Sequence, residues 1–529
     1  MAENAEKKKG RSGWLAILLA MAMFVLVVDT SIMNVSIAAI VNDLGTTVSD
    51  IQAAIALEAL VSAAFILIGS KLGDLYGRKR AYILGLIGYG IGAIAMTLTQ
   101  NIIFVIIFWA IIGGLGASLL LPAMQSLVHG NFEGAEQRRA YALVGAAAAI
   151  AAAVGPLLGG FITTYLSWRV GFLLEAVIIA IVLINIRMVK DVPYTGPRQV
   201  DVLGAVLSVF GMGGIVLSIL VWQEGGEAVG LLLAVGIVAM ILLGWWLLRR
   251  KKQEKPTLLD PDLFRSVYFR LGISGQTLQN IALGGMMIAL PIYFQMVFEY
   301  SAMQTGLAIA PLSLSMFGIA LLAGRRAGKR RGSVIIRAGF AALSIGVVLL
   351  IPLVPRASSG LIFAIPLIIT GTGLGLLVSQ LNNYTLSPIS EERVSEAAGV
   401  NSAGGSFGLS FGLAFAGAIM LATLSIAFTS MAESSVVLSP SQQQQVSAAL
   451  EEDAQIMSNT QLEAQLAGQS ADVQAEIIRI NTEARHLALQ VALLVPLLAA
   501  VLGLFDSIGM VRLLEPEPAN TAEGTILGG

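Results

Sequence analysis

Long apolar runs separated by short polar segments dominate this chain of 529 residues. A helix needs about 20 mostly apolar residues to cross the ~30 Å hydrocarbon core of a bilayer. Fourteen such runs occur, at 14–36, 49–70, 81–99, 102–122, 141–164, 170–189, 203–222, 229–248, 271–297, 305–323, 334–353, 361–384, 398–428 and 486–506. The pattern predicts an all-α integral membrane protein with fourteen transmembrane helices.

The basic residues sort by side of the membrane under this assignment. Fourteen spans place both termini on one side, and the segments on that side hold 28 of the 32 Lys and Arg residues. The other four are Arg169, Arg356, Arg479 and Arg485. Because cytoplasmic loops carry an excess of Lys and Arg, both termini are predicted to be cytoplasmic.

Composition narrows the class of protein further. The chain is 56% hydrophobic and 12% charged, against roughly 25% charged residues in soluble proteins. A soluble enzyme, a nucleic-acid-binding protein and a disordered protein are therefore excluded. The chain has no Cys and two His, so no metal site and no cofactor are expected. We expect a multi-pass protein of the plasma membrane that is a monomer.

Two basic loops suggest an internal repeat. Residues 71–80 follow the second predicted helix, and residues 324–332 follow the tenth. Their separation fits two six-helix halves with two helices between them, and repeated halves are typical of transporters. The alternative is that every cytoplasmic loop is basic.

The predicted organisation has four parts. The boundaries are 1–190 for the first six-helix bundle, 191–264 for two inserted helices and a cytoplasmic linker, 265–510 for the second six-helix bundle, and 511–529 for a disordered cytoplasmic tail.

The segment 430–485 is the longest predicted loop, and the helix count places it outside. Pro440 and Ser470 stand where helices begin, and apolar residues follow them at helical spacing. We expect a helical hairpin that leads into the last span and caps the outer mouth or lies on the lipid interface. A solvated acidic spacer is the alternative.

Three acidic residues lie inside predicted spans: Asp29, Glu58 and Glu175. An ionised side chain at the bilayer centre costs at least ~2.5–3.5 kcal/mol, so such residues are functional candidates. Desolvation disfavours the charged form of a carboxyl group, which allows it to take up and release a proton. The three are predicted to couple transport to protons. Alternatively, Asp29 hydrogen-bonds a neighbouring helix and Glu175 pairs with Arg169.

Amides take the place of acids in the second half. The residues expected to line a substrate cavity are Asn34, Gln276, Gln279, Asn280, Gln380 and Asn383. Amides also tie helices to one another, which is the structural alternative.

A glycine–proline segment interrupts the fifth span at Gly155, Pro156, Gly159 and Gly160. Proline bends a helix, and glycines four residues apart let a second helix approach closely. The segment is predicted to seal two bundles against each other, or to be a purely structural kink.

At these residues the chain resembles the major facilitator superfamily, and in particular its fourteen-helix drug:proton antiporters. The resemblance extends through about residue 510. It rests on the loop residues Asp74, Gly77, Arg78 and Lys79, the Gly155–Gly160 segment, the first-helix stretch Asp29–Val35, and Ser167-Trp168-Arg169. The resemblance implies that the loop forms a cytoplasmic gate and that the Gly155–Gly160 segment is the antiporter motif.

The chain also departs from that pattern. Ser70, Ala151 and Ala38 replace the usual Gly, Gly and Pro. The buried Arg that many members carry in the fourth helix is Ala110 by register, and Glu58 stands where an aromatic residue is usual. The resemblance therefore implies coupling through Asp29 and Glu58 and not through an Arg–acid pair.

The resemblance implies proton-coupled efflux of hydrophobic or cationic small molecules, by alternating access, with protons and the lipid bilayer as the other partners. Export of an endogenous lipid or lipid-linked metabolite is the alternative within transport. A membrane-embedded enzyme or a sensor is more remote, since the sequence shows no nucleophile–base set and no phosphate-binding loop.

Overall fold

The protein is described here from a computed structural model that covers residues 2–132, 134–191, 201–223, 226–325, 331–389, 391–444 and 459–514. Within these ranges the structure is helical and contains no strand. Thirteen helices in the described ranges are long and apolar enough to cross a membrane. The all-α membrane fold is thereby confirmed. The remaining predicted span coincides with α7, which has 17 residues, so the number fourteen stays a prediction.

The first half of the chain forms a helical bundle. Its elements are α1 (Ala2–Leu44), α2 (Val48–Tyr76), α3 (Arg78–Leu98), α4 (Ile102–Phe104), η1 (Val105–Gly113), α5 (Gly114–Asn131), α6 (Gly134–Tyr165), α7 (Trp168–Ile184) and η2 (Ile186–Met188). Short turns separate several of these helices. At the start of α2, Thr47 and Asp50 cap each other's backbone N–H groups, an arrangement that fixes where a helix begins.

The second half repeats this plan after two inserted helices. The inserted pair is α8 (Val202–Gln223) and α9 (Val229–Lys252), followed by η3 (Pro261–Arg265). The second bundle consists of α10 (Val267–Val297), α11 (Ala302–Arg325), α12 (Gly332–Leu350), η4 (Ile351–Arg356), η5 (Gly360–Phe363), α13 (Ala364–Leu386), α14 (Glu391–Glu433), α16 (Asn459–Gln465), α17 (Ala471–Ala492) and α18 (Leu494–Arg512).

The two bundles share one packing scheme. In the first, α1 packs on α6 and α7, while α3 packs on α5 and α7. In the second, α10 packs on α14 and α18, while α12 packs on α13 and α18. Between the bundles, α2 lies against α14 and α6 lies against α11, and α8 covers the α2–α14 seam. This packing agrees with the predicted arrangement of two bundles with two inserted helices, whose count of six helices each stays a prediction.

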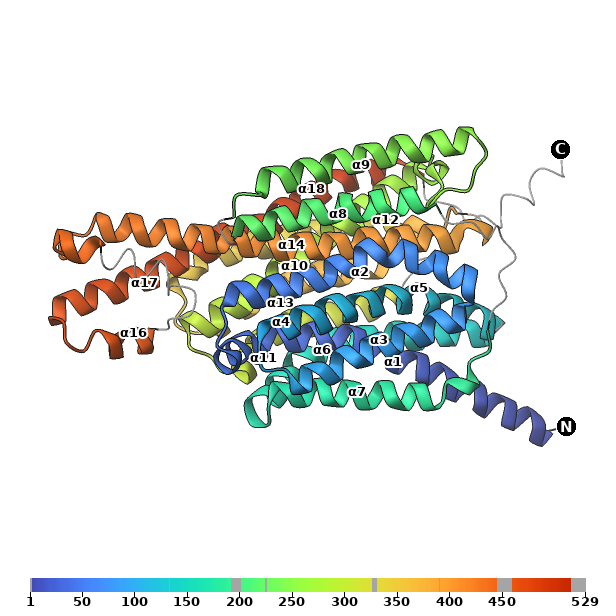
Figure 1. The fold of residues 1–529 in the computed structure, drawn as a ribbon, viewed down its shortest axis with the longest axis horizontal. Coiled ribbons are helices and arrows are strands. Elements are labelled where there is room, and N and C mark those ends of the chain that lie inside the picture. The colour runs from blue at the N-terminus through green and yellow to red at the C-terminus, as the bar shows by residue number, and fades with distance from the viewer. Residues whose placement is uncertain are drawn as a thin grey trace.

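The segment after α14 is helical and projects from the bundle. Helix α14 has 43 residues, about 65 Å at 1.5 Å per residue, which exceeds the ~40–45 Å of a whole bilayer. Its end and α17 extend beyond the other helices, at the end opposite the start of α1 (Figure 1). Ser470 directly precedes α17, where a helix start was expected, but its side chain makes no capping hydrogen bond. Residues 445–458 lie outside the described ranges.

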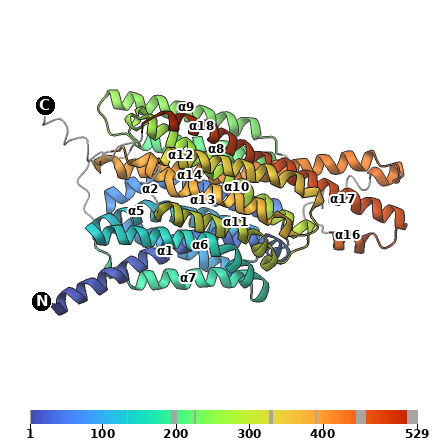
Figure 2. The same cartoon turned by 180° about the vertical axis from the view of Figure 1, so that it is seen from behind.

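Two ends of the molecule are named here for later use. The terminal face is the end that carries the start of α1 and the end of α18, and the hairpin face is the opposite end, with α16 and α17 (Figure 2). The last span is longer than predicted, since α17 and α18 run from Ala471 to Arg512 with little interruption. The predicted tail begins at residue 511, whereas α18 continues to Arg512. Residues 515–529 lie outside the described ranges.

Candidate functional site

Asp29 is buried at the centre of the first bundle and is held by neutral donors. Its side chain is 1% exposed. The hydroxyl of Tyr89 on α3 donates a hydrogen bond to Oδ2 of Asp29. The indole Nε1–H of Trp109 donates to both carboxyl oxygens, at 3.0 Å and 2.9 Å. An indole N–H can only donate, so Trp109 favours Asp29 as an acceptor.

A π-helical segment brings Trp109 to this position. Residues Val105–Gly113 form η1, in which the N–H of Gly114 reaches the carbonyls of Ala110 and Ile111. A π-helix widens the turn and rotates the residues within it, and such segments are frequent at functional sites. Trp109, next to the Ala110 found by register, therefore makes the contact with Asp29.

Tyr89 and Trp109 were not predicted from the sequence. The sequence did contain a signal for them, because a buried Tyr or Trp normally finds a hydrogen-bond partner for its polar group. Both stand within otherwise apolar spans.

Glu58 and Glu175 lie within electrostatic range of Asp29. Glu58 on α2 is partly exposed. Glu175 on α7 is 2% exposed, and neither of its carboxyl oxygens has a hydrogen-bond partner in the described part of the chain. The fold thus gathers the three predicted acids, from three helices, into one cluster.

The alternative prediction, that Glu175 pairs with Arg169, is wrong. The guanidinium of Arg169 is paired with Asp43 and donates to the carbonyl of Thr99 at 2.6 Å. Arg169 is the second residue of α7 and contacts Asp43 near the end of α1, so it serves the α1–α7 connection at the hairpin face.

The acid cluster has no cation of its own. Among the described residues, no Lys, Arg or His forms an ion pair with Asp29, Glu58 or Glu175. The described ranges also contain no group of three or more acidic or His residues that is arranged to hold a metal ion.

The Gly155–Gly160 segment lies where the two bundles meet near the hairpin face. A Cβ atom on Gly160 would lie 2.5 Å from the carbonyl oxygen of Ala302, and one on Gly159 would lie 2.9 Å from Cα of Ile32. The backbone N–H of Met303 donates to Thr164 Oγ1 at 2.9 Å across the same seam. Only glycine permits this approach of α6 to α1 and α11.

Two polar side chains, absent from the sequence prediction, also bridge the bundles. Gln295 on α10 accepts from the N–H of Ala38 at 2.9 Å and donates to the carbonyl of Val35 at 2.9 Å. Ser410 on α14 donates to the carbonyl of Ala56 on α2 at 2.7 Å. Each side chain hydrogen-bonds to the backbone of the other bundle. These hydrogen bonds hold the two bundles in contact on the hairpin side of their interface.

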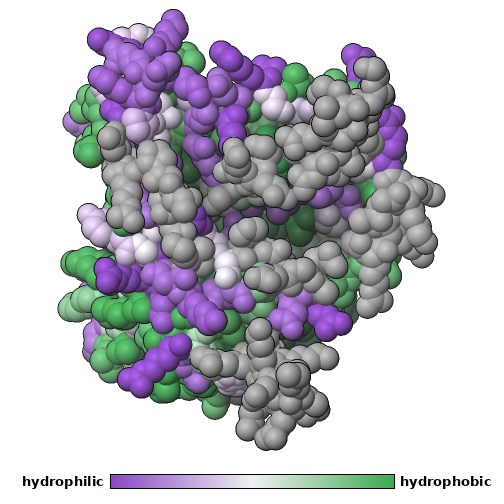
Figure 3. Space-filling view, turned by 90° about the vertical axis from the view of Figure 1, so that its right-hand side faces the viewer, coloured by the Kyte–Doolittle hydropathy of each residue, from purple (hydrophilic) through white to green (hydrophobic). Residues whose placement is uncertain are grey.

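The same helices are less closely packed near the terminal face. A Cβ atom on Gly145 of α6 or on Gly318 of α11 would meet nothing within 4 Å. Figure 3 looks onto this face, where polar side chains surround apolar residues that lie deeper. Packing is therefore looser around these two positions of α6 and α11, whereas Leu67 of α2 and Val400 of α14 stay in one buried cluster at this end.

The loop between α2 and α3 has an internal ion pair, between Arg78 and Asp74 at 2.8 Å. Gly77 adopts a φ of 101°, which favours glycine. The backbone N–H of Lys79 at the start of α3 donates to Asp191 at 3.0 Å. Asp191, which was not predicted, therefore caps α3.

The predicted cavity amides are dispersed. Gln276 and Asn280 face Gly405 of α14, within 3.5 Å of where its Cβ would lie. Gln279 is buried, with an unpaired Oε1 within the described ranges. The remaining three occupy different surroundings: Asn34 and Gln380 are buried, and Asn383 is exposed.

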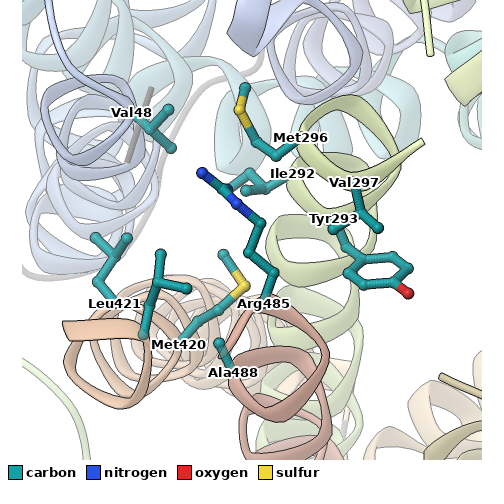
Figure 4. A pocket seen from close by; sticks show the side chains of 10 residues that line it. Val48, Ile292, Tyr293, Met296, Val297, Met420, Leu421, Arg485 and Ala488 are labelled. Atoms are coloured by element: carbon teal, nitrogen blue, oxygen red, sulfur yellow. The ribbon is translucent and has the colours of Figure 1, made fainter. Parts of the chain in front are cut away.

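Arg485 of α17 points into a narrow pocket between the bundles (Figure 4). The pocket is about 20 Å³, enough for about one water molecule. Its other walls are apolar and include Val48, Ile292 and Met420. The Nε of Arg485 donates to Asn481 at 3.1 Å. The pocket thus lies between α17, at the base of the hairpin, and Val48, the first residue of α2.

A larger cavity of about 310 Å³ opens between α10, α14 and α18. Its walls are entirely apolar and consist of Leu278, Ile281, Phe411, Phe415, Ile419, Val491, Leu494, Val495, Leu498, Ala499 and Leu502. Leu494, Leu498 and Leu502 are each about half exposed. We call this cavity the apolar groove.

Comparison with known families agrees with this architecture. The model of the Major Facilitator Superfamily matches residues 19–413. The chain belongs to this family of membrane transporters, which confirms the resemblance. The match does not test the roles of Asp29, Glu58 and Glu175, which stay predictions.

Individual relatives are similar at moderate identity. The multidrug resistance protein Stp of Mycobacterium tuberculosis is 28% identical over 413 residues, covering 77% of this chain and 76% of that protein. The puromycin resistance protein pur8 of Streptomyces alboniger is 28% identical and covers 75% and 80%. The multidrug export protein EmrB of Escherichia coli is 29% identical and covers 60% and 62%.

Solved structures share the fold. A bacterial homologue of the human lysosomal transporter Spinster aligns with a TM-score of 0.59 at 13% identity, over 95% of this chain and 98% of that one. A D-xylose–proton symporter aligns with a TM-score of 0.55 at 12% identity, over 77% and 89%.

Proposed function

We propose that this protein is a proton-coupled efflux transporter of hydrophobic or cationic small molecules. It works as a monomer in the plasma membrane, carries out no enzymatic reaction, and moves its substrate by alternating access. In this assignment the terminal face is cytoplasmic, and the hairpin face with segment 430–485 is outside.

The acid cluster is the observation that carries the proposal. Asp29, Glu58 and Glu175 bring three carboxyl groups together with neutral donors and without a basic residue among the described ones. Like charges at short range favour proton uptake by one of the group. A substrate cation that neutralises the cluster releases that proton, which is the exchange an antiporter needs.

The packing of the two bundles supports alternating access. They are joined near the hairpin face by Gln295, Ser410 and the contact of Gly160 with α11, and α6 and α11 are less closely packed toward the terminal face. We infer an inward-open state. The similarity to proteins named for multidrug resistance and export supports the outward direction of transport.

The test uses purified protein in liposomes that contain ethidium as the probe. A pH gradient should drive ethidium transport by the wild type. Asp29→Asn and Glu58→Gln should each abolish the response to the gradient, while Glu227→Gln, which changes an exposed acid between α8 and α9, should not. Wild-type pH dependence in both variants of the cluster contradicts the coupling assignment.

The apolar groove favours a second candidate function, the export of a lipid or lipid-linked metabolite. Its walls from Val491 to Leu502 span about 16 Å of helix, close to the ~15 Å depth of one leaflet. Ala499→Trp, which places an indole in the groove, should block transfer of a fluorescent phospholipid and leave ethidium transport intact. Unchanged lipid transfer excludes this function for the groove.

A further inference from the structure

Asp29 and Glu175 meet opposite conditions within one cluster. Asp29 accepts three hydrogen bonds from Tyr89 and Trp109. Glu175 is buried equally deeply, and both of its oxygens lack a partner among the described residues. An ionised carboxylate that is buried without a partner is far more costly than the neutral acid. In this conformation the proton of the pair therefore belongs on Glu175.

We propose that Glu175 stores the exchanged proton while the hairpin side is closed, and that the Tyr89 hydroxyl passes it to Asp29. Trp109 is a positioning residue, because it fixes the orientation of the Asp29 carboxyl group. This proposal rests on the proposed proton-coupled function. It adds a storage site, a direction of transfer and two aromatic residues to that function.

The transfer is balanced in atoms and charge. The O–H bond of Glu175 breaks and its proton moves to the hydroxyl oxygen of Tyr89, while the original hydroxyl proton of Tyr89 moves to Oδ2 of Asp29. One proton is transferred in total, Tyr89 is unchanged, and no electron leaves the cluster. The step requires the Glu175 carboxyl group to come within hydrogen-bond distance of the Tyr89 hydroxyl.

The surroundings contain few other titratable groups. Asp29 faces the cluster from α1, Glu58 from α2 and Tyr89 from α3, and all three interact electrostatically with one another. The segment η1 contributes Trp109, which does not titrate. Glu58 is partly exposed, so it is the member through which the proton leaves once it has reached Asp29.

The test counts protons released when a cation binds. Purified protein in weakly buffered detergent solution, with a pH-sensitive dye, is titrated with ethidium. Glu175→Gln keeps the size and hydrogen-bonding capacity of the neutral acid, so ethidium affinity should stay within about threefold while the protons released per bound cation fall by about one. Asp506→Asn changes a buried acid on α18 of the other bundle, and it should leave the count unchanged.

The outcomes separate this proposal from the function on which it rests. If the wild type binds ethidium and releases no proton, the proton-coupled function fails. If the wild type releases protons and Glu175→Gln releases the same number, storage on Glu175 is wrong. A fall in the count that Asp506→Asn reproduces also overturns it, because the effect is then not specific to Glu175.

A kinetic measurement keeps the proposal testable if Glu175→Gln does not fold. Tyr89→Phe keeps the ring and removes the hydroxyl group. In stopped-flow mixing with ethidium, it should release the same number of protons at least about tenfold more slowly, since general acid–base groups contribute ~10²–10⁴-fold to proton transfer. Release at the wild-type rate contradicts transfer through the Tyr89 hydroxyl.

Discussion

At the scale of single residues, the chemistry of this transporter depends on which groups surround Asp29. A guanidinium partner would neutralise the carboxylate permanently, whereas the phenol and indole donors leave it charged. The charge of the cluster is then set by protons and by the substrate. The three neutral hydrogen bonds to its buried carboxyl group are the reason why we propose Asp29, and not Glu175, as the proton acceptor.

Trp109→Phe tests this role by removing the Nε1–H and keeping an aromatic ring. A hydrogen bond to a charged group contributes about 1.5–3 kcal/mol, so proton-driven ethidium transport should fall by roughly 10- to 150-fold. The measurement is the initial rate in liposomes with a pH gradient.

The matched control is Trp245→Phe, at an exposed position on α9. It should transport at the wild-type rate. Equal activity of both variants would show that the indole N–H has no part in coupling.

At the scale of elements, glycine decides how closely helices approach. On α6, Gly160 touches the backbone of α11, while Gly145 faces open space four turns earlier. The same helix therefore seals the molecule at one end and lines an opening at the other. The junction of α2 and α3 also depends on a glycine. Gly77 has a positive φ there, and Asp191 accepts a hydrogen bond from the start of α3.

Gly160→Val should weaken the closed hairpin side. Inserting a branched side chain into a packed contact costs about 1–3 kcal/mol, which moves the equilibrium toward the outward-open state by roughly 5- to 150-fold. Double electron–electron resonance between spin labels at Thr164 and Met303 should show the longer distance gaining population. Gly145→Val on the same helix should leave the distribution unchanged, and a shift of equal size there contradicts the seal.

The linker before α10 is held by ion pairs with a defined pH dependence. Asp260 contacts Lys251 at 3.0 Å and Arg393 at 2.9 Å. Partial burial alone raises the pKa of Asp260, but the N–H of Asp262 and the cations of Lys251 and Arg393 outweigh it and lower that pKa. The stabilisation is therefore complete above the unfolded pKa of about 3.9 and is lost as the pH falls through the lower folded value.

Asp260→Asn should reduce thermal stability at pH 7 by about 1 kcal/mol or less, since exposed ion pairs contribute little. The difference from the wild type should shrink as the pH falls below about 4. Differential scanning fluorimetry at pH 7 and at pH 3.5 compares the two. A difference that is constant across this range shows that the ion pairs are not its cause.

At the scale of the whole molecule, transport requires the two bundles to exchange which end is closed. The absence of Cys from the chain allows clean cross-linking. A Thr164→Cys, Met303→Cys pair spans a closed contact, where the Met303 N–H lies 2.9 Å from Thr164 Oγ1. A Gly145→Cys, Gly318→Cys pair places its thiols on the open side.

A short bifunctional thiol reagent should link the first pair rapidly and stop ethidium transport. The second pair should react at least about tenfold more slowly in the absence of a pH gradient, because its linking requires the less populated state. Rapid linking of the second pair alone would show that the resting state is closed at the terminal face.

The sequence by itself determined the class of this protein, because hydrophobic length and charge sorting are properties of each span in the bilayer and need no knowledge of its neighbours. It also singled out Asp29, Glu58 and Glu175, since acids in apolar spans stand out without a structure. Tertiary structure alone brought the three together and supplied Tyr89 and Trp109. The reason is physical: which side chain faces a buried carboxyl group depends on helix rotation, and here Trp109 of the π-helical segment η1 faces Asp29. The pairing of Arg169 with Asp43, and the contact of Gly160 with α11, likewise depend on helices that are distant in sequence.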